Sequence, residues 1–207
     1  LVNKKLKYFF LSQFFNSAAN GIPGALFAFF VIHRLGREDL VGSLMIVYLT
    51  SGVIGVPIWI FLGRFFSKTK LWCFSISFSI VIFILVFFVG NNDVFLFIVI
   101  CILTGLSVSA DMALPTSIQA DLLDEDLKKT GSNRSGAFFS ILSVINKTSA
   151  AVSGAFVLLF LYCIDFDPMG NNKAHTLFYL TCLYALAPII LKLLPLFTMW
   201  SFQEEKN

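Results

Sequence analysis

Six long apolar runs, separated by short polar segments, constrain this chain more strongly than any other feature of its sequence. Hydrocarbon offers no partner to an unpaired backbone amide, so such runs cross a bilayer as helices of about 20 residues each. Charged residues make up only 13% of the chain, about half the share found in soluble domains. The sequence therefore predicts an all-α integral membrane protein. Its six transmembrane helices are expected at residues 6–32, 40–62, 71–89, 94–122, 135–162 and 176–200.

The basic residues predict how these helices are oriented, because lysine and arginine gather in cytoplasmic loops. Ten of them fall in the terminal segments and the loops of one side, whereas the loops of the other side hold three. The ten are Lys4, Lys5, Lys7, Arg64, Lys68, Lys70, Lys128, Lys129, Arg134 and Lys206, and the three are Arg34, Arg37 and Lys173. Both termini are therefore expected in the cytoplasm. Lys192 lies within the sixth run, toward its cytoplasmic end, where its long side chain is expected to reach the headgroups.

Lys147 carries the only charge in the apolar run from Phe138 to Tyr162 and lies near the middle of its helix. A central charge costs a spanning helix about 2.5 to 3.5 kcal/mol, so such a residue faces protein or water and usually has a partner. Asp111, on the preceding helix, lies about 16 Å from the cytoplasmic end of that helix, and Lys147 lies about 18 Å from its own. We therefore expect these two residues to pair across a polar interior. The pair either lines a solute pathway or serves only to hold two helices together. We favour the pathway, because charges inside the membrane usually mark one.

The first helix adds a polar stripe to this interior. Gln13, Asn16 and Asn20 recur at helical spacing, and a Gly-Ile-Pro-Gly segment at residues 21–24 follows them. Proline removes a backbone hydrogen bond, so we expect the helix to be interrupted there. Broken helices with polar stripes form the midplane sites of transporters. The alternative is a tilted interfacial helix whose amides make ordinary contacts between helices.

The run "PTSIQADLLDEDLKKTGSNRSGAFFSILSVINKTSAAVSG" resembles the signature of the glycoside–pentoside–hexuronide cation symporters. These are the melibiose-carrier branch of the major facilitator superfamily. The matching residues are Ala120, Asp121, Asp124, Thr130, Gly131, Arg134, Gly136, Phe139, Ser140 and Lys147. The loop "LGRFFSKTK" is similar to the basic loop that follows the second helix of each half in that superfamily. Two positions depart from the pattern, Glu125 in place of an aromatic residue and Asn133 in place of a basic one.

The resemblance implies that residues 1–207 form the C-terminal six-helix half of a twelve-helix bundle. It implies a cytoplasmic gate, to which Asp121, Asp124, Arg134 and Arg64 are assigned. It also implies that Lys147 lines the cavity near the solute or the cation. The expected pathway then comprises Lys147, Asp111, Asn146, Ser143, Gln119, Gln13, Asn16 and Asn20. In the resembling carriers the coupling cation, Na⁺ or H⁺, is bound mainly in the N-terminal half, so that half is the expected partner of this chain.

No enzyme active site is predicted. His33 and His175 lie in loops without a second histidine at metal-binding spacing, and no glycine-rich phosphate loop follows a strand. We therefore expect no cofactor beyond the coupling cation, no metal site and no nucleic-acid partner. The expected partners are the lipid bilayer, a small-molecule solute and the other half of the bundle.

Three functions remain open at this point. The favoured one is secondary active transport of a small, sugar-like solute together with Na⁺ or H⁺, as the C-terminal half of a symporter. The second is a six-helix half-transporter that needs a dimer or a separately encoded partner. The third is a non-transporting scaffold or a remnant of a split gene. Leu1 in place of methionine favours a fragment, and the abundance of phenylalanine, isoleucine, lysine and asparagine suggests an AT-rich genome and a bacterial inner membrane.

Overall fold

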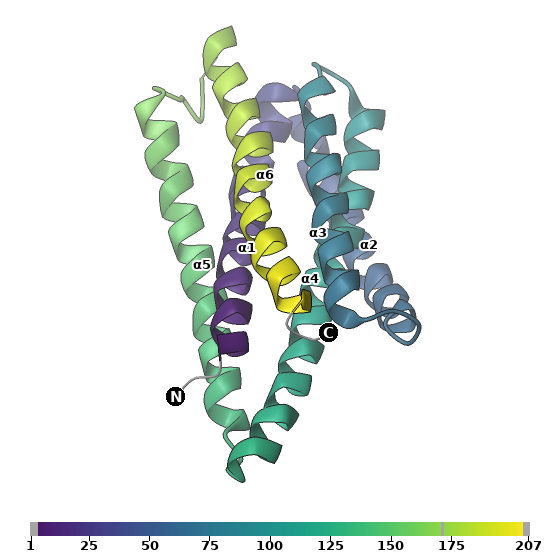
Figure 1. Ribbon diagram of the computed structural model, residues 1–207. Helices are drawn as coiled ribbons and strands as arrows, with labels where there is room; N and C mark the ends of the chain where they lie inside the picture. Colours follow the sequence, from purple (N-terminus) through teal and green to yellow (C-terminus); the bar gives the residue numbers. More distant parts are fainter. Residues whose placement is uncertain (1–3, 171, 205–207) are drawn as a thin grey trace.

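The structure is a computed structural model that describes residues 4–170 and 172–204, and this part of the chain contains helices and no strand. Figure 1 shows a bundle of six long helices joined by short loops. The elements are α1 (Lys4–Phe29) with a π-helical turn (Phe30–Arg34), a 3-10 turn (Glu38–Leu40), α2 (Val41–Leu62), α3 (Lys68–Leu85) with a 3-10 turn (Val86–Phe88), α4 (Val94–Thr130), α5 (Ser135–Cys163) and α6 (Ala174–Glu204). All six helices are long and apolar enough to cross a membrane. The prediction of an all-α, multi-pass membrane protein is confirmed.

The helix boundaries lie close to the predicted ones except at the cytoplasmic end of α4. This helix continues past Leu122 to Thr130, and Gly131 ends it with a positive φ of 68° and a hydrogen bond from its N–H to the Leu127 carbonyl. The apolar run stops at Leu122, but the leucine, aspartate, glutamate and lysine residues that follow remain compatible with a helix outside the hydrocarbon. Hydropathy marks the edge of the membrane and not the end of the helix.

The predicted interruption of the first helix is wrong. α1 continues from Lys4 to Phe29 through Pro23. Transmembrane helices tolerate proline because neighbouring helices and local adjustments satisfy the freed backbone groups. Gly21 has a different role, since a Cβ at this position would lie 2.8 Å from the Cβ of Ser153 on α5. The glycine lets α1 and α5 approach closely.

The helices form a layered arrangement around α1 and α4. α1 packs against α5 and α6, α2 packs against α4, and α3 lies between α4 and α6. α4 and α5 meet at their cytoplasmic loop and then diverge, as Figure 1 shows. The first turn of α1 and the last turn of α6 lie toward the same end of the bundle as this loop (Figure 1), which agrees with termini on one side of the membrane.

Two apolar clusters fill the bundle, one in each half of its thickness. The outer cluster contains Phe30, Phe97 and Tyr184, and the cytoplasmic cluster contains Phe9 and Trp72. Along α1, α3, α4 and α6 several buried polar residues lie between the segments that contribute to these two clusters: Ser12, Gln13, Asn16, Ser79, Ser107, Ser109 and Lys192. The bundle therefore contains a polar layer near mid-membrane with an apolar cluster on either side.

Small residues bring α2 and α4 into close contact. A Cβ added to Gly105 would meet the backbone oxygen of Tyr48, and one added to Gly55 would meet the side chain of Ser109. Helix association in lipid depends on this kind of close backbone approach. Gly55 on α2 and Gly105 on α4 thus allow these two helices to pack closely.

We predict that Gly105→Ala destabilises the protein by about 1–3 kcal/mol, because the new Cβ meets backbone that cannot rotate away. Gly154→Ala on α5 is the matched control, since no neighbouring atom lies within 4 Å of its added Cβ. Alanine is a better helix former than glycine, so this control is expected to be neutral or stabilising. Thermal unfolding of the purified full-length protein in detergent measures both. Equal stability of the two variants would contradict the close contact of α2 and α4.

Candidate functional site

A buried carboxylate lies at the centre of the polar layer. Asp111 on α4 accepts three hydrogen bonds: from Trp72 Nε1 to Oδ1 at 2.9 Å, and from Asn20 Nδ2 (2.7 Å) and Lys192 Nζ (3.3 Å) to Oδ2. These donors come from α3, α1 and α6 respectively. One carboxylate thereby joins four of the six helices.

Lys192 balances the charge of this carboxylate. Its side chain is completely buried, and its ammonium donates to Asn16 Oδ1 at 2.9 Å as well as to Asp111. Burying a lone charge is strongly unfavourable. A buried ion pair is tolerated when hydrogen bonds satisfy its remaining donors and acceptors. We call Asp111, Lys192, Asn16, Asn20 and Trp72 the central network.

The central network overturns two sequence-based expectations. Lys192 does not reach the headgroups but points into the bundle, and Asp111 pairs with Lys192 in place of Lys147. Depth along a helix cannot tell which helices are neighbours, and both lysines lie well inside their helices. α6 and α4 are brought together through α1 and α3, whereas α5 diverges from α4 at this level.

Lys147, the other lysine within a membrane-spanning helix, remains unpaired. It is exposed on α5, and within the described residues it makes no hydrogen bond or ion pair. Its chain neighbour Asn146 accepts hydrogen bonds from Gln13 Nε2 and Ser17 Oγ, both at 3.0 Å. Lys147 is thus adjacent to a group of polar side chains that joins α1 to α5.

An open cavity of about 330 Å³ lies between α1, α4 and α5. Its polar lining residues are Gln13, Ser17, Asn20, Asp111, Thr116 and Asn146, and its apolar ones are Val108, Met112, Pro115 and Leu142. Gln13 Oε1 is buried and has no hydrogen-bond partner within the described residues. We call this space the polar cavity.

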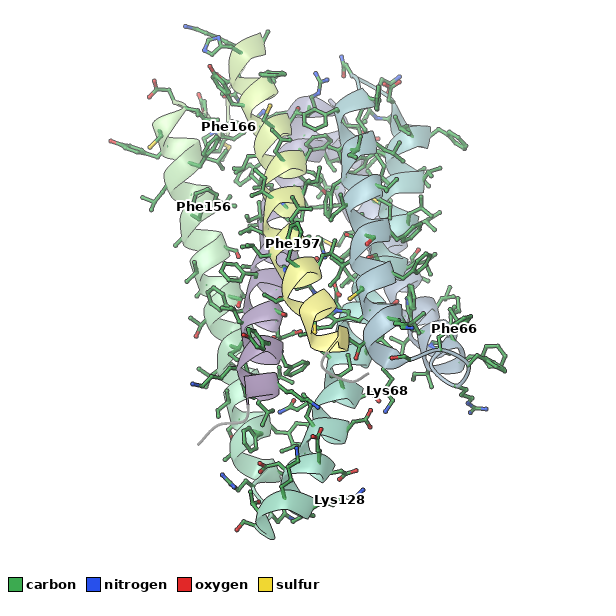
Figure 2. All side chains as sticks on the ribbon, in the orientation of Figure 1. Phe66, Lys68, Lys128, Phe156, Phe166 and Phe197 are labelled. Carbon is green, nitrogen blue, oxygen red and sulfur yellow. The ribbon has the colours of Figure 1, made fainter. Side chains whose placement is uncertain are left out.

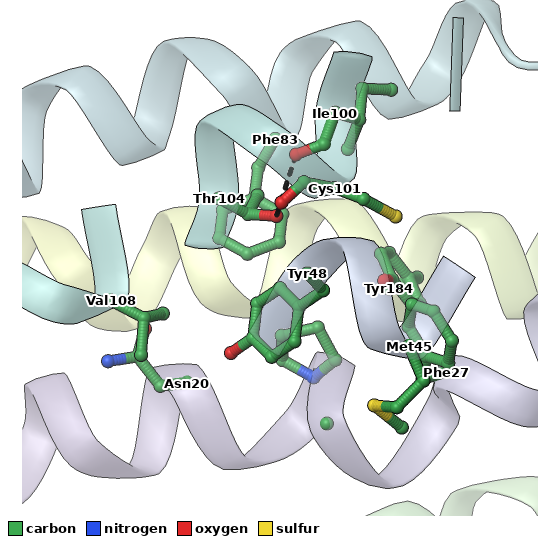
Figure 3. Close-up of a pocket in the computed structure, with 12 residues that line it drawn as sticks. Asn20, Phe27, Met45, Tyr48, Phe83, Ile100, Cys101, Thr104, Val108 and Tyr184 are labelled. Atoms are coloured by element: carbon green, nitrogen blue, oxygen red, sulfur yellow. Dashed lines mark hydrogen bonds between the residues drawn. The ribbon is translucent and has the colours of Figure 1, made fainter. Parts of the chain in front are cut away.

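A second, smaller cavity lies on the extracellular side of the first. It has a volume of about 50 Å³, is mainly apolar, and shares Asn20 and Val108 with the polar cavity. Figure 3 shows Tyr48, Phe83 and Thr104 around it, with the Thr104 hydroxyl bonded to the carbonyls of Ile100 and Cys101. This volume admits only a few water molecules. The polar cavity is therefore the larger of these two spaces.

The structure brings most of the predicted pathway residues together. Gln13, Asn20, Asp111 and Asn146 line the polar cavity, and Asn16 lies in the central network. The other predicted members, Lys147, Ser143 and Gln119, are not among the residues that line the cavity. Ser143 is exposed and unbonded within the described residues, and Gln119 is fully buried with neither amide atom bonded there.

Sequence reasoning missed Trp72 and misplaced Lys192. Trp72 sits in an apolar run, so its indole N–H was the one signal of a buried acceptor nearby. For Lys192 the signal was the same as for Lys147, a charge within a spanning helix. Neither signal identifies the partner.

Two of the four predicted gate residues, Asp121 and Arg134, are paired within these six helices. Both oxygens of Asp121 accept from Lys68 Nζ at 2.7 Å, and Arg134 Nε lies 3.6 Å from Asp126 Oδ2. Arg64 and Asp124 are exposed and unpaired within the described part of the chain. The gate role therefore stays a prediction, with Arg64 and Asp124 available for contacts to another half.

Comparisons with known proteins give a family and several relatives. The family described as MFS/sugar transport protein matches residues 1–205. The chain is 31% identical over 200 residues to the sodium-dependent lysophosphatidylcholine symporter 1 of Xenopus tropicalis, covering 93% of this chain and 38% of that relative. For the human protein of the same name the values are 30% over 199 residues, 93% and 36%. For the sphingosine-1-phosphate transporter MFSD2B of Xenopus tropicalis they are 25% over 162 residues, 77% and 31%.

The chain thus spans no more than 38% of the length of these relatives. All three are named as symporters or transporters, in agreement with the predicted superfamily. They are named for lipids, whereas the sequence motifs had suggested the sugar-carrying branch.

We predict that Lys192→Met destabilises the protein by about 3–5 kcal/mol, because it leaves the Asp111 carboxylate buried without its counter-charge. Adding Asp111→Asn to Lys192→Met removes the stranded charge and is expected to recover part of this loss. Lys147→Met is the matched control and should change stability by less than about 0.5 kcal/mol, since Lys147 is exposed.

Unfolding of the full-length protein in detergent measures all three variants. A larger loss for Lys147→Met than for Lys192→Met would contradict the pairing of Asp111 with Lys192.

Proposed function

Because this chain belongs to the MFS/sugar transport protein family, we propose that it is the C-terminal half of a cation-coupled transporter whose solute is a single-chain phospholipid or a similar amphiphile. The polar cavity is the part of the solute pathway that this half supplies. Lys147 is the residue proposed to attract the phosphate of the headgroup.

The observation that carries this proposal is the charge distribution around the polar cavity. Asp111 lines the cavity, but its carboxylate already accepts three hydrogen bonds, one of them from Lys192, which neutralises its charge. Apart from Asp111, the charge nearest to this lining along the chain is the exposed Lys147, which follows the lining residue Asn146 but does not itself line the cavity. Lysine is a common phosphate ligand and acts there as a compact point charge. The site therefore favours a solute with an anionic group.

The lining of the cavity supports an amphiphile. One part consists of amide and hydroxyl groups, including Gln13, Ser17 and Asn146, and another consists of apolar side chains, including Met112 and Leu142. Met112 is 68% exposed, which leaves an apolar surface open next to the polar one. A headgroup and the first part of a hydrocarbon chain would each find a matching surface.

The names of the relatives support the same solute class. Lysophosphatidylcholine and sphingosine-1-phosphate, for which those proteins are named, each combine one long hydrocarbon chain with a phosphate. The relatives named as symporters are sodium-dependent by name, which supports Na⁺ as the coupling cation. We propose that this cation is held outside these six helices, because Asp111 is already neutralised.

A sugar is the second candidate solute. It is favoured by the family description and by the neutral hydrogen-bonding residues of the cavity, among them Gln13, Ser17 and Asn146. A sugar would not need Lys147, and this difference separates the two candidates.

We predict that Lys147→Ala lowers sodium-dependent uptake of a labelled lysophospholipid at least tenfold, since a charge-assisted contact to phosphate is lost. Lys147→Arg keeps the charge and is expected to retain most of the uptake. Lys173→Ala, which removes an exposed lysine from the loop between α5 and α6, is the control that should behave as the unmodified protein. The full-length protein in proteoliposomes, with and without Na⁺, provides the assay.

Uptake of a labelled disaccharide in place of the lysophospholipid, unaffected by Lys147→Ala, would favour the sugar and contradict the amphiphile. Transport of neither would remove the support for both.

A further inference from the structure

A groove separate from the polar cavity lies at the cytoplasmic ends of α2 and α3. Its volume is about 400 Å³, and it is lined by Leu62, Phe66, Lys70, Leu71 and Phe74. α2 and α3 each pack against α4 and make few contacts with each other. The two helices therefore leave an apolar space between them just before and after their connecting loop, which we call the α2–α3 groove.

The α2–α3 groove lies at the level of the cytoplasmic headgroups. α2 has 22 residues, and at 1.5 Å per residue it is about 33 Å long, close to the thickness of the hydrocarbon core. The loop that follows α2 is thus at the membrane surface. Lys68 in this region bonds to Asp121 on α4, beyond which α4 continues into the cytoplasm.

The charge around the α2–α3 groove is unbalanced. Arg64 and Lys70 are exposed, and within the described residues neither side chain makes an ion pair or hydrogen bond. Several other basic residues on this side are paired: Lys68 with Asp121, Lys5 and Lys129 with Glu125, and Arg134 with Asp126. Of these two cations without counter-ions, Lys70 lines the groove, and Arg64 lies in the chain between the lining residues Leu62 and Phe66.

Exposed aromatic rings complete this surface. Phe65, Phe66 and Phe74 are 68%, 60% and 61% exposed. Figure 2 labels Phe66 at the outer edge of the loop and Lys68 on the side toward α4. Aromatic and basic residues together are typical of the interface between hydrocarbon and headgroups. The surface matches a molecule with an apolar chain and an anionic head that lies in the membrane.

We propose that the α2–α3 groove binds a phospholipid of the cytoplasmic leaflet that carries a net negative charge, such as phosphatidylglycerol. An acyl chain lies against Leu62, Leu71 and Phe74, and the phosphate lies between Lys70 and Arg64. This lipid stays bound and is not the transported solute, because the α2–α3 groove and the polar cavity share no lining residue. The inference does not depend on the proposed function.

Native mass spectrometry of the full-length protein, released from detergent after incubation with one lipid at a time, tests this proposal. Phosphatidylglycerol is expected to remain bound in preference to phosphatidylcholine with the same acyl chains. Lys70→Gln should weaken phosphatidylglycerol binding about fivefold, and Lys70→Gln with Arg64→Gln about 25-fold, because each cation near anionic headgroups contributes roughly equally. Phe66→Ala should weaken the binding of both lipids.

Lys128→Gln is the matched control, since Lys128 is an exposed, unpaired lysine at the cytoplasmic tip of α4 (Figure 2), and it should bind phosphatidylglycerol as the unmodified protein does. All of these substitutions are at exposed side chains, and gel filtration confirms that each variant folds. Equal binding of the two lipids would overturn the proposal. Unchanged phosphatidylglycerol binding in the double variant would do the same. So would crosslinks from Phe74→Cys to another protein segment, because that segment would then occupy the groove.

Discussion

A lysine ammonium and an aspartate carboxylate, paired in the middle of the bundle, hold the arrangement of these helices together. Lys192 is fully buried, and it pairs with Asp111 in the polar layer between the two apolar clusters. Neither charge is stable there alone, so α4 and α6 have to remain in register. Asn16, Asn20 and Trp72 extend this requirement to α1 and α3.

The central network also determines what the polar cavity can attract. Because Lys192 neutralises Asp111, the acid that lines the cavity does not compete for a cationic group. Lys147 is the exposed charge that follows the lining residue Asn146 on α5. α5 carries Lys147 past the cavity without packing along α4. A buried pair that stabilises the helices and an unpaired lysine that we propose meets the solute are thus two separate uses of charge in one membrane layer.

The helices could be predicted from the sequence, because each apolar run has to satisfy its own backbone hydrogen bonds within lipid. The polar stripe of α1 was also predictable, because Gln13 and Asn20 recur at helical spacing. The partner of Asp111 was not, because two lysines lie at suitable depths and only tertiary packing selects Lys192. The extension of α4 to Thr130 was missed because hydropathy reports the membrane boundary and not helix propensity.

The most direct test of this account is the chemical accessibility of the two intramembrane lysine positions. Lys147→Cys and Lys192→Cys are introduced separately into a full-length protein whose native cysteines are replaced by serine or alanine, and each is treated with a charged, water-soluble thiosulfonate. The account predicts rapid modification at position 147, slowed by a lysophospholipid, and no modification at position 192 while the protein stays folded. Modification at position 192 of the folded protein, together with no modification at position 147 in the absence of lysophospholipid, would contradict it.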